Sequence, residues 1–131
     1  MKANDYPCQE ETRAIIGCAF EVLNELGHGL SERPYENALV VEFRRRDIAW
    51  EQQRRFSILY KGEEVGEFVP DLIVAGRVVV DAKCIDQITD HERGKMINYL
   101  RITGLTIGLI LNFKRARLEY ERVVLSGDSC S

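Results

Sequence analysis

The sequence FVPDLIV at residues 68–74, followed by VVVDAK at residues 78–83, decides both the fold class and the candidate chemistry. Both segments are rich in β-branched and other apolar residues, which is typical of strands buried in a sheet. Residues two apart on a strand share a face, so Asp81 and Lys83 point the same way while their apolar neighbours point into the opposite packing layer. The pattern therefore predicts a carboxylate and an amine side by side on one face.

The turn between the two segments decides where Asp71 points. The sequence Val74-Ala75-Gly76 places glycine at the third position, where a three-residue loop needs a left-handed residue. This loop pairs Ile73 with Arg77 and puts Asp71 on the face of Asp81, roughly 7 Å away between Cα atoms. A two-residue loop puts Asp71 on the opposite face instead. The sequence leaves both registers open.

Asp71 and Asp81 are candidate metal ligands. Neighbouring carboxylates repel each other, and their burial at the end of apolar strands is unfavourable unless a cation neutralises them. Magnesium prefers oxygen ligands and is usually held by one or two carboxylates together with phosphate oxygens of a substrate. Lys83 is then a candidate for stabilising negative charge on a phosphate. The alternative is a surface ion pair between Asp81 and Lys83, which contributes little to stability.

The residues before the two central segments predict two helices and a hairpin. Apolar positions that repeat every three or four residues predict helices at 10–26 and 31–46. Alternation of apolar and polar residues predicts strands at 56–60 and 65–74, joined by a turn at Lys61-Gly62. The second of these strands includes Asp71.

The residues after the central segments predict a third helix and two more strands. Thr89 and Glu92 have the spacing of a capping box, which predicts a helix that continues to about Arg101. Strand-like runs follow at 106–112 and 118–125. This order of helices and strands predicts an α/β fold with a central mixed sheet flanked by helices.

The composition is that of a folded protein. We expect one domain over residues 1–131, with its core at about 10–125 and a disordered tail at 127–131. Hydrophobic residues make up 45% and charged residues 30%, which excludes disordered and low-complexity classes. The net charge of −3 argues against a protein that coats nucleic acid through its bulk charge.

Neither a membrane anchor nor a metal-binding cysteine motif is expected. The longest uncharged apolar stretch, 102–113, is about half the length that a membrane-spanning helix needs. Residues 1–5 lack the basic and apolar layout of a secretory signal, so a cytoplasmic location is expected. The four cysteines show no C-x-x-C spacing, and reduced thiols are expected.

The order Pro70-Asp71, nine intervening residues, then Asp81-Ala82-Lys83 resembles the motif of the PD-(D/E)XK nuclease superfamily. The stretch GLSERPY at residues 29–35 also resembles the signature of the small bacterial GxxExxY protein family. Further similarity lies in GLILNF at residues 108–113, and the resemblance spans about residues 14–113. It implies a restriction-endonuclease-like core.

The resemblance also implies roles for individual side chains. In such nucleases the carboxylates corresponding to Asp71 and Asp81 hold Mg²⁺ or Mn²⁺, and the lysine corresponding to Lys83 assists phosphodiester hydrolysis. Such nucleases often add a helix carboxylate, and Glu36 matches that place as a catalytic, metal-binding residue. Its alternative is a first-turn acid that the helix dipole favours. Glu32 is a second candidate because it belongs to the signature.

Three residues are candidates for substrate binding. Tyr35 closes the signature, and Lys95 and Tyr99 lie four apart on one face of the third predicted helix. Related nucleases often carry glutamine where this sequence has Lys95, and many carry glutamate where it has Asp81. The chain therefore departs from the usual pattern at two of the positions that matter most.

These observations predict a metal-dependent nuclease that acts on DNA or RNA. The alternative is a noncatalytic nucleic-acid-binding or protein-interaction module that retains the nuclease fold, which Lys95 and the modest charge favour. A self-associating domain, forming a homodimer, is a third interpretation. Basic residues at 44–46, 54–55 and 114–117 either steer a nucleic acid toward the site or are simply solvated.

Overall fold

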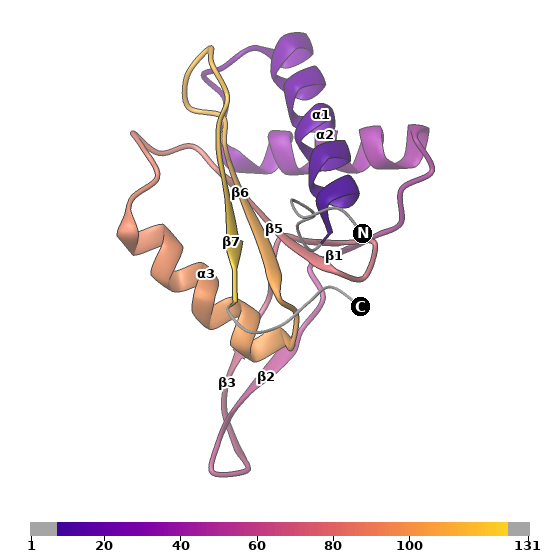
Figure 1. Cartoon of the computed structure of the whole chain (residues 1–131). Coiled ribbons are helices and arrows are strands. Elements are labelled where there is room, and N and C mark those ends of the chain that lie inside the picture. Colours follow the sequence, from indigo (N-terminus) through magenta and orange to yellow (C-terminus); the bar gives the residue numbers. More distant parts are fainter. Residues whose placement is uncertain (1–7, 126–131) are drawn as a thin grey trace, which may run out of the picture.

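The computed structural model describes residues 8–125 (Figure 1). The expected tail at 127–131 and the N-terminal residues 1–5 lie outside this range. The elements within it, in chain order, are α1 (Gln9–Leu26), α2 (Glu32–Arg45), β1 (Trp50–Gln52), β2 (Phe56–Tyr60), β3 (Glu63–Phe68), β4 (Leu72–Val74), β5 (Val78–Lys83), α3 (Asp90–Thr103), β6 (Ile107–Asn112) and β7 (Glu119–Val124).

A five-stranded mixed sheet forms the centre of the molecule, with the strand order β1-β4-β5-β6-β7. β5 and β6 are parallel and are connected through α3, whereas the other neighbouring pairs are antiparallel. Helices α1 and α2 pack on one face of the sheet and α3 on the other (Figure 1). The predicted α/β fold with a central mixed sheet flanked by helices is confirmed.

The two faces of β5 serve different layers, as its alternating pattern predicts. Val80 and Ala82 belong to the apolar cluster formed with α1 and α2. Val79 belongs to the smaller cluster formed with Met96 of α3. Because residues two apart on a strand share a face, Asp81 continues the face that α3 covers. The candidate site therefore lies on the α3 side of the sheet.

One predicted strand is divided in the structure. β3 ends at Phe68 and pairs with β2 in a separate two-stranded sheet, whereas β4 begins at Leu72 and pairs with β5. Pro70 lies between β3 and β4 and has no N–H to donate to a strand ladder, so it separates the two pairings. The prediction of one strand over 65–74 is wrong for this reason.

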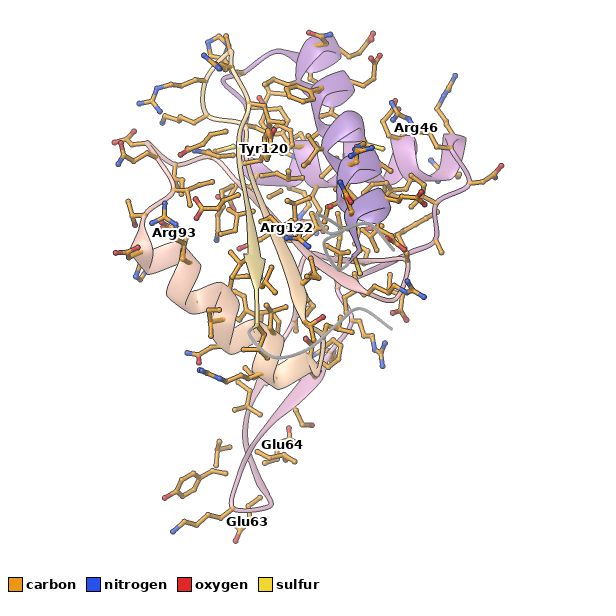
Figure 2. All side chains as sticks on the ribbon, in the orientation of Figure 1. Arg46, Glu63, Glu64, Arg93, Tyr120 and Arg122 are labelled. Atoms are coloured by element: carbon orange, nitrogen blue, oxygen red, sulfur yellow. The ribbon has the colours of Figure 1, made fainter. Side chains whose placement is uncertain are left out.

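The β2–β3 hairpin projects away from the main sheet (Figure 1). Its turn contains Lys61 and Gly62, both left-handed with φ of 52° and 83°, as the sequence predicts. The outer part of the hairpin is exposed, and Glu63 and Glu64 lie near its tip (Figure 2). The base of the hairpin, in contrast, reaches the candidate site through Phe68.

Helix α3 begins and ends as its sequence predicts. Thr89 accepts a hydrogen bond from the backbone of the first turn, and Glu92 bonds back to the Thr89 N–H at 2.8 Å, which completes the capping box. Gly104 ends the helix in the left-handed conformation, with φ 78°. The helix packs closely on β6 because Gly108 has no side chain. A Cβ at this position would lie only 2.4 Å from Met96 Sδ.

Other expectations of the sequence have mixed outcomes. Cys18 and Cys84 are free thiols, whereas Cys8 is disulfide-bonded, so the expectation of reduced cysteines is wrong for Cys8. Within residues 8–125, no helix is long and apolar enough to cross a membrane.

Candidate active site

The turn before β5 sets the register of the site. Ala75 and Gly76 are both left-handed, with φ of 56° and 64°. Ile73 pairs with Val79 rather than with Arg77, so the predicted pairing is wrong by two residues. Because side chains alternate with a period of two, this shift keeps both carboxylates on the predicted common face.

The carboxylates and the lysine of the motif converge on one cavity. Asp71 lies directly before β4, and its Oδ2 accepts the backbone N–H of Ala82 at 3.0 Å. Oδ2 of Asp81 lies 3.3 Å from Nζ of Lys83. Asp71, Asp81 and Lys83 all line a cavity of about 170 Å³. Pockets for drug-sized ligands measure roughly 300–1,000 Å³, so this cavity is smaller than a typical pocket of that kind.

An aromatic pair closes one side of the cavity. Phe68, at the end of β3, and Tyr99, in α3, stack with ring centroids 4.0 Å apart and an interplanar angle of 13°. Both rings line the cavity, together with Val69 and Pro70. The stack connects the base of the β2–β3 hairpin to α3. Phe68 is not among the site residues expected from the sequence, although its place two residues before Pro70 was a signal for the site.

The environment of Asp71 favours its protonated form. Burial, followed by the negative charge of Asp81, raises the pKa of Asp71 from 3.8 to about 6. A hydrogen bond between the two carboxyl groups, which forms only when one of them is protonated, acts in the same direction. The N–H of Ala82 and the charge of Lys83 oppose this rise but do not cancel it. The pair therefore favours an added positive charge.

Lys83 and Tyr99 both keep their protons. Burial lowers the pKa of Lys83, but the charge and hydrogen bond of Asp81, followed by Glu32 and Tyr99, outweigh it and raise the pKa above its ordinary value. Burial and the charges of Asp81 and Asp71 raise the pKa of Tyr99. At neutral pH the cavity therefore offers an ammonium group and a phenol hydroxyl as donors.

Comparison with known proteins agrees with this geometry. A family model described as the PD-(D/E)XK nuclease superfamily matches residues 9–123. The chain belongs to this superfamily. The match includes the central sheet, the helices on both of its faces and the cavity, and the predicted restriction-endonuclease-like fold is confirmed.

A solved structure shows the same fold at low sequence identity. The crystal structure of SSO0001 aligns with a TM-score of 0.57 and 12% identity over 92% of this chain. The chain spans 61% of the length of that protein. At this identity the likeness shows the fold alone. No curated protein matches the sequence.

The raised pKa of Asp71 predicts that the stability of the metal-free protein depends on pH. A carboxyl with a higher pKa in the folded than in the unfolded protein stabilises the fold while it is protonated. That contribution is complete below about pH 4 and is lost as the pH rises through about 6. Asp71→Asn removes the ionisation. The free energy of unfolding of the variant relative to the wild type should therefore rise by roughly 1–2 kcal/mol from pH 4 to pH 7.5, after allowance for solvent screening.

Urea unfolding in the presence of chelator at both pH values measures this difference. Asp86→Asn is the matched control, because Asp86 is an exposed aspartate outside the cavity. We expect its effect on the free energy of unfolding to be the same at both pH values. A gain for Asp71→Asn that does not change with pH would contradict the prediction.

Three predicted site residues lie away from the cavity lining. Tyr35 is fully buried, and its hydroxyl donates to the Gly27 carbonyl at 2.6 Å and accepts the Leu30 N–H at 3.2 Å. Lys95 is exposed one turn before Tyr99. Glu36 is buried, but across residues 8–125 no three acidic, histidine or cysteine side chains are grouped closely enough to hold a metal. Glu36 therefore does not join the two aspartates.

Glu32, the second helix candidate, lies nearer to the lysine end of β5. Its Oε2 accepts the backbone N–H of Cys84 at 3.1 Å, and its charge contributes to the raised pKa of Lys83. Residues 29–35 are thereby linked, at the start of α2, to the end of β5. The hydrogen bonds of Glu32 and Tyr35 show that both side chains have structural roles in this segment.

Proposed function

We propose that the protein is a metal-dependent nuclease that hydrolyses phosphodiester bonds in DNA or RNA and belongs to the GxxExxY group of the superfamily. The observation that supports this most is the convergence of Asp71, Asp81 and Lys83 on one small cavity. Membership of the superfamily supports the same reaction class.

The two aspartates fit a magnesium or manganese ion. Their four carboxylate oxygens are the hard donors that these ions prefer, and one or two carboxylates with waters and substrate phosphate suffice for Mg²⁺. The raised pKa of Asp71 is a sign that the pair favours a nearby positive charge. When bound, the ion would polarise the phosphate and neutralise the charge that develops during hydrolysis.

The other side chains of the cavity have distinct proposed roles. Lys83 remains a cation and stabilises negative charge on the phosphate, while the N–H of Ala82 holds Asp71 in place. The hydroxyl of Tyr99 donates a hydrogen bond to a phosphate oxygen. Because Lys83 stays protonated, we do not assign it the role of a general base.

The loop after β6 is the basic segment that best suits a nucleic acid. Lys114 and Arg117 form no ion pair within residues 8–125, and Arg115 donates to a backbone carbonyl and so keeps its charge. Lys83 is aligned with Asn112 in the parallel register, which puts this loop at the same end of the sheet as the cavity. We propose that the loop contacts the phosphate backbone beside the scissile bond.

The basic residues before the hairpin suit this role less well. Arg54 is paired with Glu51 at 3.0 Å, and Arg55 is paired with Glu67 at 2.5 Å. The tip of the hairpin carries Glu63 (Figure 2), whose charge repels a polyanion. Nucleic acid is therefore expected to approach from the side of the β6–β7 loop.

A noncatalytic nucleic-acid-binding module is the second candidate. Lys95 stands where related nucleases often carry glutamine, and its side chain is exposed rather than part of the cavity lining. If this position is required for hydrolysis, the domain binds nucleic acid without cleaving it.

A metal titration with cleavage assays distinguishes the two candidates. The purified protein is incubated with single- and double-stranded DNA and RNA in Mg²⁺, in Mn²⁺ and in chelator. The nuclease proposal predicts cleavage that requires the metal and is lost in chelator. Binding without cleavage of any of the four substrates under every metal condition would support the noncatalytic module instead.

A further inference from the structure

Glu36 has its own set of partners beside the cavity. The residue is only 3% exposed, and its Oε2 accepts hydrogen bonds from Nε2 of Gln52 at 2.8 Å and Nε2 of Gln53 at 2.9 Å. Nε of Arg33 lies 3.9 Å from the other oxygen, Oε1. A buried carboxylate is unfavourable without such donors, so these contacts satisfy it locally.

Gln53 links this carboxylate to the catalytic motif. It follows β1 and has a left-handed backbone with φ 60°. A glutamine in this conformation is strained, because its Cβ approaches the following carbonyl. In this conformation its N–H donates to the backbone carbonyl of Asp71 at 3.2 Å. The strained residue therefore holds the backbone of a cavity carboxylate.

We propose that Glu36 is a positioning residue for Asp71 rather than a metal ligand. Its carboxylate holds the Gln53 side chain, which keeps the Gln53 backbone left-handed and its N–H directed at the Asp71 carbonyl. The Ala82 N–H fixes the carboxyl end of Asp71, so the two contacts hold its backbone and its side chain independently. The role of Asp71 as a metal ligand rests on the proposed function, whereas the contacts of Glu36 and Gln53 do not depend on it.

The two roles predict different responses to substitution. A ligand acts through its negative charge, so Glu36→Gln should weaken metal binding as much as Glu36→Ala. A positioning residue acts through its acceptor oxygen, which glutamine keeps, so Glu36→Gln should change metal affinity less than about threefold. Glu36→Ala should lower it by roughly tenfold, in the range typical of residues that orient a ligand.

A second substitution tests the connection through Gln53. Glycine adopts the left-handed conformation without strain, so Gln53→Gly should remove the need for Glu36. The double variant Glu36→Ala/Gln53→Gly should therefore regain most of the metal affinity that Glu36→Ala loses. Asn37→Ala is the control, because Asn37 accepts a hydrogen bond from Gln52 at 2.9 Å but has no contact with Gln53.

Calorimetric titration with Mn²⁺ and amide hydrogen exchange by NMR give the two measurements. We expect Glu36→Ala to speed exchange at the residue 53 amide by about tenfold, and the double variant and Glu36→Gln to restore protection. Equal loss of metal affinity in Glu36→Gln and Glu36→Ala, without recovery in the double variant, would overturn the proposal and make Glu36 a ligand. Because exchange is measured without metal, it tests the positioning role separately from metal binding. A wild type that binds no Mn²⁺ would contradict the proposed function alone. Unchanged exchange at the residue 53 amide in Glu36→Ala would contradict the positioning role.

Discussion

Replacing Lys83 with alanine is expected to lower the rate of metal-dependent cleavage by roughly 100-fold or more. Its ammonium group lines the cavity and is held 3.3 Å from Asp81, and its pKa is raised, so it presents a fixed positive charge at neutral pH. Such a charge acts most strongly on the additional negative charge of the transition state. Nucleic-acid affinity, which depends on many phosphate contacts, should fall by less than about threefold.

Cleavage rates under saturating metal and binding across a salt series separate these effects. Lys114→Ala is the control, since it should weaken binding and lower the salt slope by about one while leaving the cleavage rate at saturating substrate unchanged. Lys95→Gln, which introduces the residue common in related nucleases, should preserve or raise cleavage. Cleavage that survives Lys83→Ala undiminished would remove Lys83 from the catalytic residues.

Local sequence patterns were sufficient for most of the fold. The capping box at Thr89 and the left-handed Gly104 bound α3, and alternation in β5 separates Val79 from Val80 into different layers. These features depend on interactions within a few residues, which a sequence displays directly. The short strand β1 depends instead on its pairing with β4, so its three residues carry too little periodicity to reveal it.

The β3–β4 boundary shows a related limit. The apolar run continues through Pro70, but the strands on either side of it pair with different partners. Proline predicts an interruption of the ladder, whereas the choice of a new partner depends on tertiary contacts. The strand pairing after the turn at Ala75 depends on tertiary contacts in the same way. The prediction therefore placed the side chains on the correct faces, but its register differed from the observed one by two residues.

The candidate site was predictable where a strand fixes the direction of a side chain. Asp81 and Lys83 lie together because their spacing on β5 requires it. The burial of Glu36 follows from helix periodicity, because this residue shares one helix face with the buried Leu39 and Phe43. Periodicity does not define which strand the side chain meets, and the long carboxylate reaches the end of β1 at Gln52 rather than β5.

Replacing Asp81 with asparagine is expected to weaken Mg²⁺ or Mn²⁺ binding by at least about tenfold, with the fold intact. Residues that only orient a metal ligand change affinity by roughly 10- to 100-fold, so loss of a ligand charge should have at least that effect. The amide keeps the shape of the side chain. In the metal-free protein the substitution removes both the repulsion from Asp71 and the ion pair with Lys83, and these opposite effects should largely cancel.

Calorimetric titration and the dependence of cleavage on metal concentration test this expectation. Since Asp81→Asn weakens binding of the ion, excess Mn²⁺ should restore part of its cleavage, whereas no metal concentration should restore Lys83→Ala. Asp86→Asn provides an exposed aspartate outside the cavity as the control. Unchanged metal affinity in Asp81→Asn would assign Asp81 to its ion pair with Lys83. In that case the raised pKa of Asp71 would reflect a carboxyl pair that shares a proton rather than a metal.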